Sequence, residues 1–317
     1  IIAGADRVRE PAPNLYYHSP HHPSRRTQPM PHSKKRKRWS TLRSTSRQSE
    51  FAELIARYPR RTRIVAEGDS WFVYPRKRLF AGKPNNIINY LKKMERFNLL
   101  HLASNGSVAV AMLSGDSKVR LLQSIHRNNV DFLLFSGGGN DIVGRWDFDY
   151  FLKDRVNSKH FEDYLHTGRL SRRITQITHA YEDLIDYCTA YSQNPAIRII
   201  THTYDYLVPN PQGADFFGGL FKPDRGQAWL YPFLIDKQVP EALHAPLVRY
   251  LVDRLAECLL KLQDRHAKRL VVVDTRGLID PANGWLNEIH PKQQSTKGLP
   301  SRQTIRLSRN WRERQCG

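Results

Sequence analysis

The fold is decided by the stretch Arg63-Ile64-Val65-Ala66-Glu67-Gly68-Asp69-Ser70-Trp71-Phe72, in which an apolar strand breaks into a Gly-Asp-Ser turn. A serine at the end of a buried strand can stand at the edge of a sheet with its hydroxyl exposed. Ser70 is therefore a candidate nucleophile if other segments supply a base and an oxyanion site. Three later segments carry suitable groups: Asn105-Gly106, Gly138-Gly139-Asn140-Asp141 and Asn287-Glu288-Ile289-His290-Pro291.

Predicted strands and helices alternate along the chain around this stretch. Besides the strand over 63–66, strands are expected near 99–102 and over 131–135, 197–201 and 269–273. Helices are expected over 51–58, 87–97, 118–126, 171–191 and 241–262. Five short strands that alternate with helices predict an α/β protein with a parallel sheet covered on both faces.

Two stretches do not fit this alternation. Residues 145–168 are aromatic and charged and are expected to form an insertion. Residues 208–238 are loop-like but rich in phenylalanine, tryptophan and tyrosine. Long aromatic loops in α/β enzymes often cover a site, and they can equally cap the core of their own domain. The sequence leaves these two roles open.

The positive charge is concentrated at the ends of the chain. The net charge is +20, and residues 1–50 hold 11 lysines and arginines against 3 acidic residues, while residues 291–317 hold 7 against 1. A nucleic-acid-binding domain is expected to carry its charge on a folded face, so solvated, disordered tails are the favoured interpretation. The predicted organisation is a basic tail with a lead-in helix over 1–58, a domain over 59–292 and a basic tail over 293–317.

Several classes of protein are disfavoured by composition. Cys188, Cys258 and Cys316 form no disulfide framework, and the first two are expected to be buried thiols within helices. No apolar run approaches the ~18 residues of a membrane span, and no signal-peptide core opens the chain, so a cytoplasmic location is the default expectation. The histidines show no metal-ligand spacing, so neither a metal nor a cofactor is expected.

Four polar or glycine residues follow predicted strands in order. Ser70 follows the first strand, Gly106 the second, Asn140 the third and His290 the last. Ligands of open parallel sheets bind beyond the carboxyl ends of the strands, so these groups can converge on one edge. Asn140 offers an amide donor, and Gly106 offers a backbone N–H that no Cβ shields.

The four blocks resemble those of the SGNH (GDSL-type) hydrolase family, whose markers are Ser, Gly, Asn and His in this order. The resemblance covers roughly residues 60–292. It implies a flavodoxin-like three-layer α/β/α fold with about five parallel strands. It also implies that the chain hydrolyses esters or thioesters, with a small-molecule acyl ester as its partner. It also implies that Ser70 is the nucleophile, that His290 is the base, and that Asn140 and the N–H groups of Ser70 and Gly106 form the oxyanion hole.

One position departs from the family. An aspartate usually stands three residues before the histidine, and here that position is Asn287. In serine proteases the change from Asp to Asn costs about 10⁴ in rate. Glu288 could turn in as a substitute, a backbone carbonyl could orient the ring and leave a Ser-His dyad, or activity could be low. The dyad is favoured because the side chains of adjacent residues in an extended turn, here Asn287 and Glu288, point in different directions. Glu288 is therefore expected to be a solvated charge on the surface.

The neighbours of the markers have structural interpretations as well. Asp69 is expected to brace its turn by accepting backbone N–H groups, and Asp141 to cap the helix after the third block. Trp71 and His202 are candidates for lining a substrate pocket, although a hydrogen-bonded structural role suits His202 better. The second Gly-Asp-Ser, at 115–117, follows no predicted strand and is expected to cap a helix.

Two functions from different classes follow from these observations. The first is a serine-dependent ester or thioester hydrolase with the site residues given above. The alternative is a binding protein that has this fold but weakened catalysis, with basic tails that contact nucleic acid or acidic partners. Asn287 and the net charge of +20 motivate the alternative.

Overall fold

A computed structural model describes residues 43–74, 86–211 and 228–292. Its strands are β1 Ser44–Thr45, β2 Thr62–Gly68, β3 Phe97–His101, β4 Phe132–Ser136, β5 Arg198–His202 and β6 Leu270–Val273. They form one parallel sheet in the order β1-β3-β2-β4-β5-β6. Apart from β1, this is the flavodoxin-like order, in which the chain reverses direction across the sheet at its first long strand.

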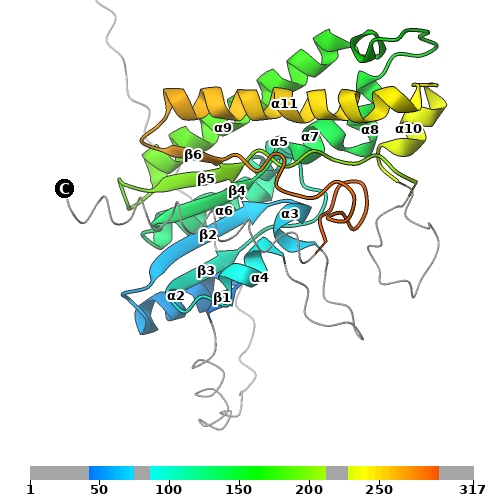
Figure 1. Cartoon of the computed structure of the whole chain (residues 1–317). Helices are drawn as coiled ribbons and strands as arrows, with labels where there is room; N and C mark the ends of the chain where they lie inside the picture. Colours follow the sequence, from blue (N-terminus) through cyan, green and yellow to red (C-terminus); the bar gives the residue numbers. More distant parts are fainter. Residues whose placement is uncertain (1–42, 75–85, 212–227, 293–317) are drawn as a thin grey trace, which may run out of the picture. The chain divides into compact units, whose positions relative to one another are not determined.

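Helices cover both faces of the sheet. They are α2 Gln48–Arg57, α3 Ser70–Val73, α4 Ile87–Leu91, α5 Ala109–Met112, α6 Gly115–Arg127, α7 Gly139–Val143, α8 Arg145–Phe151, α9 Thr167–Tyr191, α10 Tyr231–Asp236 and α11 Glu241–Arg265, with the 3-10 helix η1 Phe161–Tyr164. The two longest, α9 and α11, contact each other and cross one face (Figure 1). None of the helices in the described ranges is long and apolar enough to cross a membrane.

Alternating side chains of the strands divide the core into two layers. Val65 of β2 packs into the larger layer with residues of α2, α5, α6, α9 and α11. Ile64 and Ala66 point to the opposite face and pack with Phe72 of α3 and Ile87 of α4. The predicted three-layer α/β/α fold with a parallel sheet is therefore confirmed, with six described strands instead of about five.

The chain joins the sheet earlier than its sequence indicates. Ser44 and Thr45 pair with Leu99 and Leu100 of β3, and Phe51 and Leu54 of α2 are fully buried. The packed part of the chain thus includes residues that the sequence assigns to the tail and lead-in helix before residue 59. A two-residue strand is held by backbone hydrogen bonds and leaves no periodic pattern to detect. The expected tails over 1–42 and 293–317 lie outside the described residues.

Local differences from the predicted elements are small. The helix expected over 87–97 ends at Leu91, and Phe97, the last residue of that range, begins β3. The predicted insertion over 145–168 consists of α8 and η1, joined by a bridge between Leu152 and Leu165. Residues 115–117 form the first turn of α6, and the cap position falls on Ser114. Within the aromatic stretch 208–238, residues 228–238 contain α10, and residues 212–227 lie outside the described part.

Two of the three cysteines are described, and both are buried within helices as predicted. Cys188 lies in α9 and Cys258 in α11. Burial raises the pKa of the Cys188 thiol to about 12, so this side chain stays protonated and unreactive.

Candidate active site

Three of the four marker residues follow adjacent strands of the sheet, and the fourth, His290, lies after β6. Strands β3, β2 and β4 are neighbours and parallel, so their carboxyl ends share one edge. Ser70 begins α3 just after β2, Gly106 lies in the loop after β3, and Asn140 lies in α7 after β4. The chain order reverses at β2, and crevices at such switch points are where open α/β sheets bind their ligands.

Asp69 fixes the turn that presents Ser70. Its backbone N–H donates to the Ser136 carbonyl (3.1 Å), and its Oδ1 accepts the N–H of Trp71 (3.0 Å), which caps α3. The same carboxylate accepts the hydroxyls of Ser136 (2.8 Å) and Tyr204 (2.6 Å). Burial raises the pKa of Asp69 to about 6, and the bonds from Tyr204 and Ser136 oppose that rise. The carboxylate is thus occupied with bracing the turn.

The second and third blocks are joined by two hydrogen bonds. The Asn140 amide donates to the Ser107 carbonyl (2.9 Å), which leaves its second N–H for another acceptor. Asp141 accepts the N–H of Ala109 (2.8 Å), the first residue of α5. Asp141 therefore stabilises the start of the helix in the second block, whereas the sequence suggested the helix after its own block. Gly106 has a φ of +77°, a left-handed conformation that glycine adopts without strain.

Asn287 orients the ring of His290. Its Oδ1 accepts the backbone N–H groups of Ile289 (3.1 Å) and His290 (2.9 Å) and lies 3.1 Å from Nδ1 of His290. Two backbone donors on this atom identify it as the amide oxygen, so Nδ1 must carry the hydrogen of the ring. In this tautomer Nε2 carries the lone pair of the ring. The acceptor at Nδ1 is therefore the Asn287 side chain, not the backbone carbonyl expected for the favoured dyad, and it contributes no charge.

Glu288 is buried, and its predicted role as a solvated surface charge is wrong. The side chain is 2% exposed, and its carboxylate accepts the backbone N–H groups of Trp229, Leu230 and Tyr231 (2.7 Å for Tyr231). Burial raises the pKa of Glu288, and these backbone donors oppose the rise. The carboxylate holds the segment before α10 against the His290 segment, so it is not available as a substitute for the missing aspartate.

His290 lies in an aromatic setting that the sequence did not reveal. Its ring stacks on Tyr74, with centroids 3.8 Å apart and an interplanar angle of 24°. Tyr74 follows α3, and its N–H donates to the Ser70 carbonyl (2.7 Å). One short helix therefore carries the candidate nucleophile at its start and the ring that contacts the candidate base at its end. Burial lowers the pKa of His290 to about 3, so the ring is neutral at pH 7.

Ser70 and Asn140 line the same small cavity. Its volume is about 20 Å³, enough for one water molecule, and Trp71, Tyr204 and Ile289 also line it. His202 does not: it is 1% exposed, with Nε2 lying 2.8 Å from the Ser136 hydroxyl, in the structural role that the sequence favoured. Gly106, Asn287 and His290 do not line this cavity either.

The sequence analysis also missed two residues that bind Asp69, Tyr204 and Ser136. Both bind Asp69, and Tyr204 also lines the cavity. Tyr204 stands in the segment Thr201-His202-Thr203-Tyr204-Asp205-Tyr206 after β5, where only its position at the sheet edge could have suggested it. In the described ranges, no group of three His, Cys, Asp or Glu side chains is arranged to hold a metal ion.

Comparison with known proteins finds similar chains among solved structures only. No family model and no curated protein matches the sequence. The lipase Lip_vut3 from a goat rumen metagenome is 14% identical, with 77% of this chain and 96% of that chain covered and a TM-score of 0.49. The acetylxylan esterase Axe2 from Geobacillus stearothermophilus, crystallised as a catalytic mutant, is 13% identical (76% and 91% covered, TM-score 0.45). A protein from Slackia heliotrinireducens, described as an SGNH hydrolase, is 10% identical (77% and 99% covered, TM-score 0.41).

Proposed function

We propose that this protein is a serine-dependent hydrolase of acyl esters or thioesters. The observation that carries the proposal is the shared cavity of Ser70 and Asn140 at the carboxyl edge of the sheet. A serine hydroxyl and an amide donor that line one space supply two groups that acyl transfer requires, a nucleophile and a donor to the oxyanion. The tautomer set by Asn287 supports His290 as the base.

In the proposed reaction, Ser70 Oγ bonds to the acyl carbon while Nε2 of His290 takes the hydroxyl proton. The carbonyl electrons move onto oxygen, and the oxyanion is stabilised by the free N–H of Asn140 and by the N–H groups of Ser70 and Gly106. The bond to the leaving group then breaks, and His290 returns the proton to the departing alcohol or thiol. Water repeats these steps on the acyl-enzyme and releases the acid.

A fluorophosphonate probe tests the proposal directly. Attack by an activated serine forms an O–P bond, expels fluoride and transfers the proton to the base. We expect the wild-type chain to be labelled and Ser70→Ala to lose labelling, because no other described serine lies beside Asn140 in the cavity. Ser117→Ala is the matched control, since it removes the serine of the second Gly-Asp-Ser and should label like the wild type. Labelled sites are read by peptide mass spectrometry.

The outcomes separate the candidate functions. If Ser70→Ala is still labelled, the nucleophile is a residue other than Ser70. A folded wild-type chain that takes no label would contradict the hydrolase and favour the binding protein with weakened catalysis.

A further inference from the structure

Tyr204 has a strained backbone close to the candidate nucleophile. Its φ is +62°, in the left-handed region that bulky residues rarely occupy, and its side chain is buried. Such a conformation is energetically costly and persists only where the surroundings enforce it. Strained residues of this kind cluster at functional sites.

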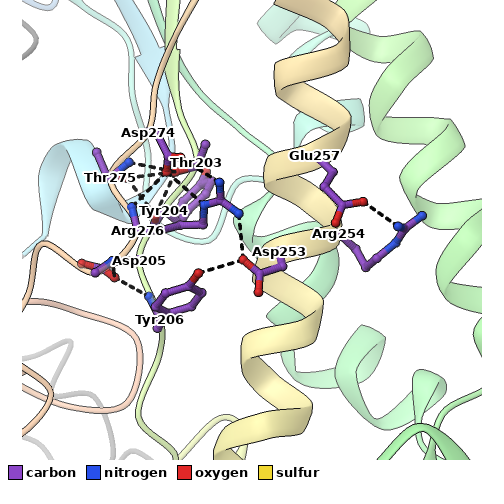
Figure 2. A network of polar contacts seen from close by, with 11 residues as sticks. Thr203, Tyr204, Asp205, Tyr206, Asp253, Arg254, Glu257, Asp274, Thr275 and Arg276 are labelled. Atoms are coloured by element: carbon purple, nitrogen blue, oxygen red, sulfur yellow. Dashed lines mark hydrogen bonds and ion pairs between the residues drawn. The ribbon is translucent and has the colours of Figure 1, made fainter.

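The ends of β5 and β6 hold this backbone in place (Figure 2). The Thr275 hydroxyl donates to the Tyr204 carbonyl (2.8 Å), and the Thr275 N–H donates to Thr203 Oγ1 (2.9 Å). The Thr203 hydroxyl donates in turn to Asp274 (3.0 Å). Arg276 completes the network by donating to Asp274 (2.7 Å) and to Asp253 of α11 (2.8 Å). This bracing connects Tyr204 to the loop after β6 and to α11.

The Tyr204 side chain contacts both turns of the candidate site. Its hydroxyl donates to Asp69 (2.6 Å), the residue before Ser70. Its ring lies so close to Gly139, the residue before Asn140, that a Cβ at that glycine would be 2.5 Å from the ring. One side chain therefore lies against the residues that precede the candidate nucleophile and the candidate oxyanion donor.

We propose that Tyr204 is a positioning residue that holds Ser70 and Asn140 in their relative places. The inference rests on the proposed function, because it assigns Tyr204 a role in that reaction. The hydroxyl fixes the Ser70 turn through Asp69, and the ring fixes the Asn140 turn through Gly139. A displacement of about 1 Å between reacting groups can lower the rate about 100-fold. The rate of the proposed reaction should therefore depend on the position that Tyr204 gives to Ser70 and Asn140.

The test is Tyr204→Phe, which removes the bond to Asp69 and keeps the ring over Gly139. Labelling by the fluorophosphonate probe is followed at several probe concentrations to separate the maximal rate of inactivation from the half-saturating concentration. We expect the maximal rate to fall about 10- to 100-fold. The half-saturating concentration and the final labelled fraction should stay within about twofold. A purely structural role would instead lower the labelled fraction through loss of folded protein.

Tyr164→Phe is the matched control. Tyr164 is another buried tyrosine, and its hydroxyl donates to the Ser158 carbonyl (3.2 Å) away from Asp69 and Gly139. Tyr164→Phe also removes the hydrogen-bonded hydroxyl of a buried tyrosine, and the maximal rate should not change.

The failures of the two proposals are distinguishable. Equal maximal rates in the wild type and Tyr204→Phe would overturn the role of Tyr204 and leave the hydrolase intact. Absence of labelling in the folded wild type would overturn both. If Tyr204→Phe does not fold, Thr275→Val decides the question, since it keeps the Tyr204 hydroxyl and removes one bond from its backbone. A fall in maximal rate supports the role, and an unchanged rate overturns it.

Discussion

Asn287 gives the His290 ring an acceptor without a charge. The two backbone N–H groups on its Oδ1 prevent the amide from flipping, so the ring keeps its hydrogen on Nδ1. In the reaction proposed above, an aspartate would also stabilise the imidazolium that forms when His290 takes a proton. The stacked ring of Tyr74 offers partial compensation, because the face of an aromatic ring attracts a cation.

Asn287→Asp should increase the rate of probe labelling at pH 7. The new carboxylate would lie within hydrogen-bond distance of Nδ1 and raise the pKa of His290 from its low value, which makes the ring a stronger base. We expect a gain of about tenfold, far less than the 10⁴ lost in proteases, because the tautomer is already correct. Asn287→Ala is the control and should label more slowly than the wild type. A slower Asn287→Asp variant would mean that burying the new charge outweighs its benefit.

Among the elements, strand β2 leads into the turn of Ser70 and contains a buried carboxyl group, that of Glu67. Glu67 is 2% exposed, and its Oε2 has no hydrogen-bond partner in the described residues. Arg120 of α6 lies 3.8 Å away and is half exposed, so water weakens its attraction. Burial raises the pKa of Glu67 to about 7 despite the opposing effects of Arg120 and of the Gly68 N–H. The strand therefore tolerates Glu67 better in its protonated form.

Glu67→Gln should flatten the pH dependence of stability. Below pH 4.5 the carboxyl is protonated in both states and contributes nothing; between pH 4.5 and about 7 the unfolded state ionises first, so stability falls as pH rises. The variant should match the wild type near pH 5 and exceed it at pH 8 by about 1–3 kcal/mol in urea unfolding. Glu53→Gln, on the exposed side of α2, controls for charge. A variant less stable at pH 8 would show that the Arg120 ion pair outweighs burial.

On the scale of the whole molecule, the sheet depends on a segment that precedes the site in the chain. β1 pairs with β3, which is the neighbour of β2, and α2 packs Phe51 into the larger core layer. The segment thus covers the edge of the sheet nearest to the strand that presents Ser70. We expect the folded domain to need these residues, although they contribute no side chain to the site.

Phe51→Ala should destabilise the chain by about 3–5 kcal/mol, because it leaves a cavity the size of a phenyl ring in a fully buried position. Glu53→Ala on the same helix is exposed and should change the free energy of unfolding by no more than about 0.5 kcal/mol. Both are measured by urea unfolding. A loss below about 1 kcal/mol for Phe51→Ala would show that α2 is dispensable to the domain.

Local patterns in the sequence were enough to predict the layers and the edge of the sheet at which the marker residues lie. Apolar runs such as 132–135 identify strands buried on both faces, and the residues after them must then lie at the carboxyl edge. These are local signals, because strand and turn formation depend on residues close together in the chain. Ser70, Asn140 and the alternation of strands and helices could be predicted for this reason.

The pairing of the polar groups, in contrast, depends on contacts between segments that are far apart in the chain. Tyr204 is 135 positions from Asp69, and Glu288 is 58 positions from Leu230, so neither partner is visible in a local pattern. The prediction that Glu288 is exposed was wrong because its backbone donors lie in a distant segment of the chain. These donors offset the cost of burying the carboxylate, and no residue near Glu288 in the sequence indicates them. The orientation of the Asn287 amide likewise depends on the turn that places two N–H groups on one oxygen. Periodicity records burial, whereas hydrogen-bond partners are set by where distant segments meet.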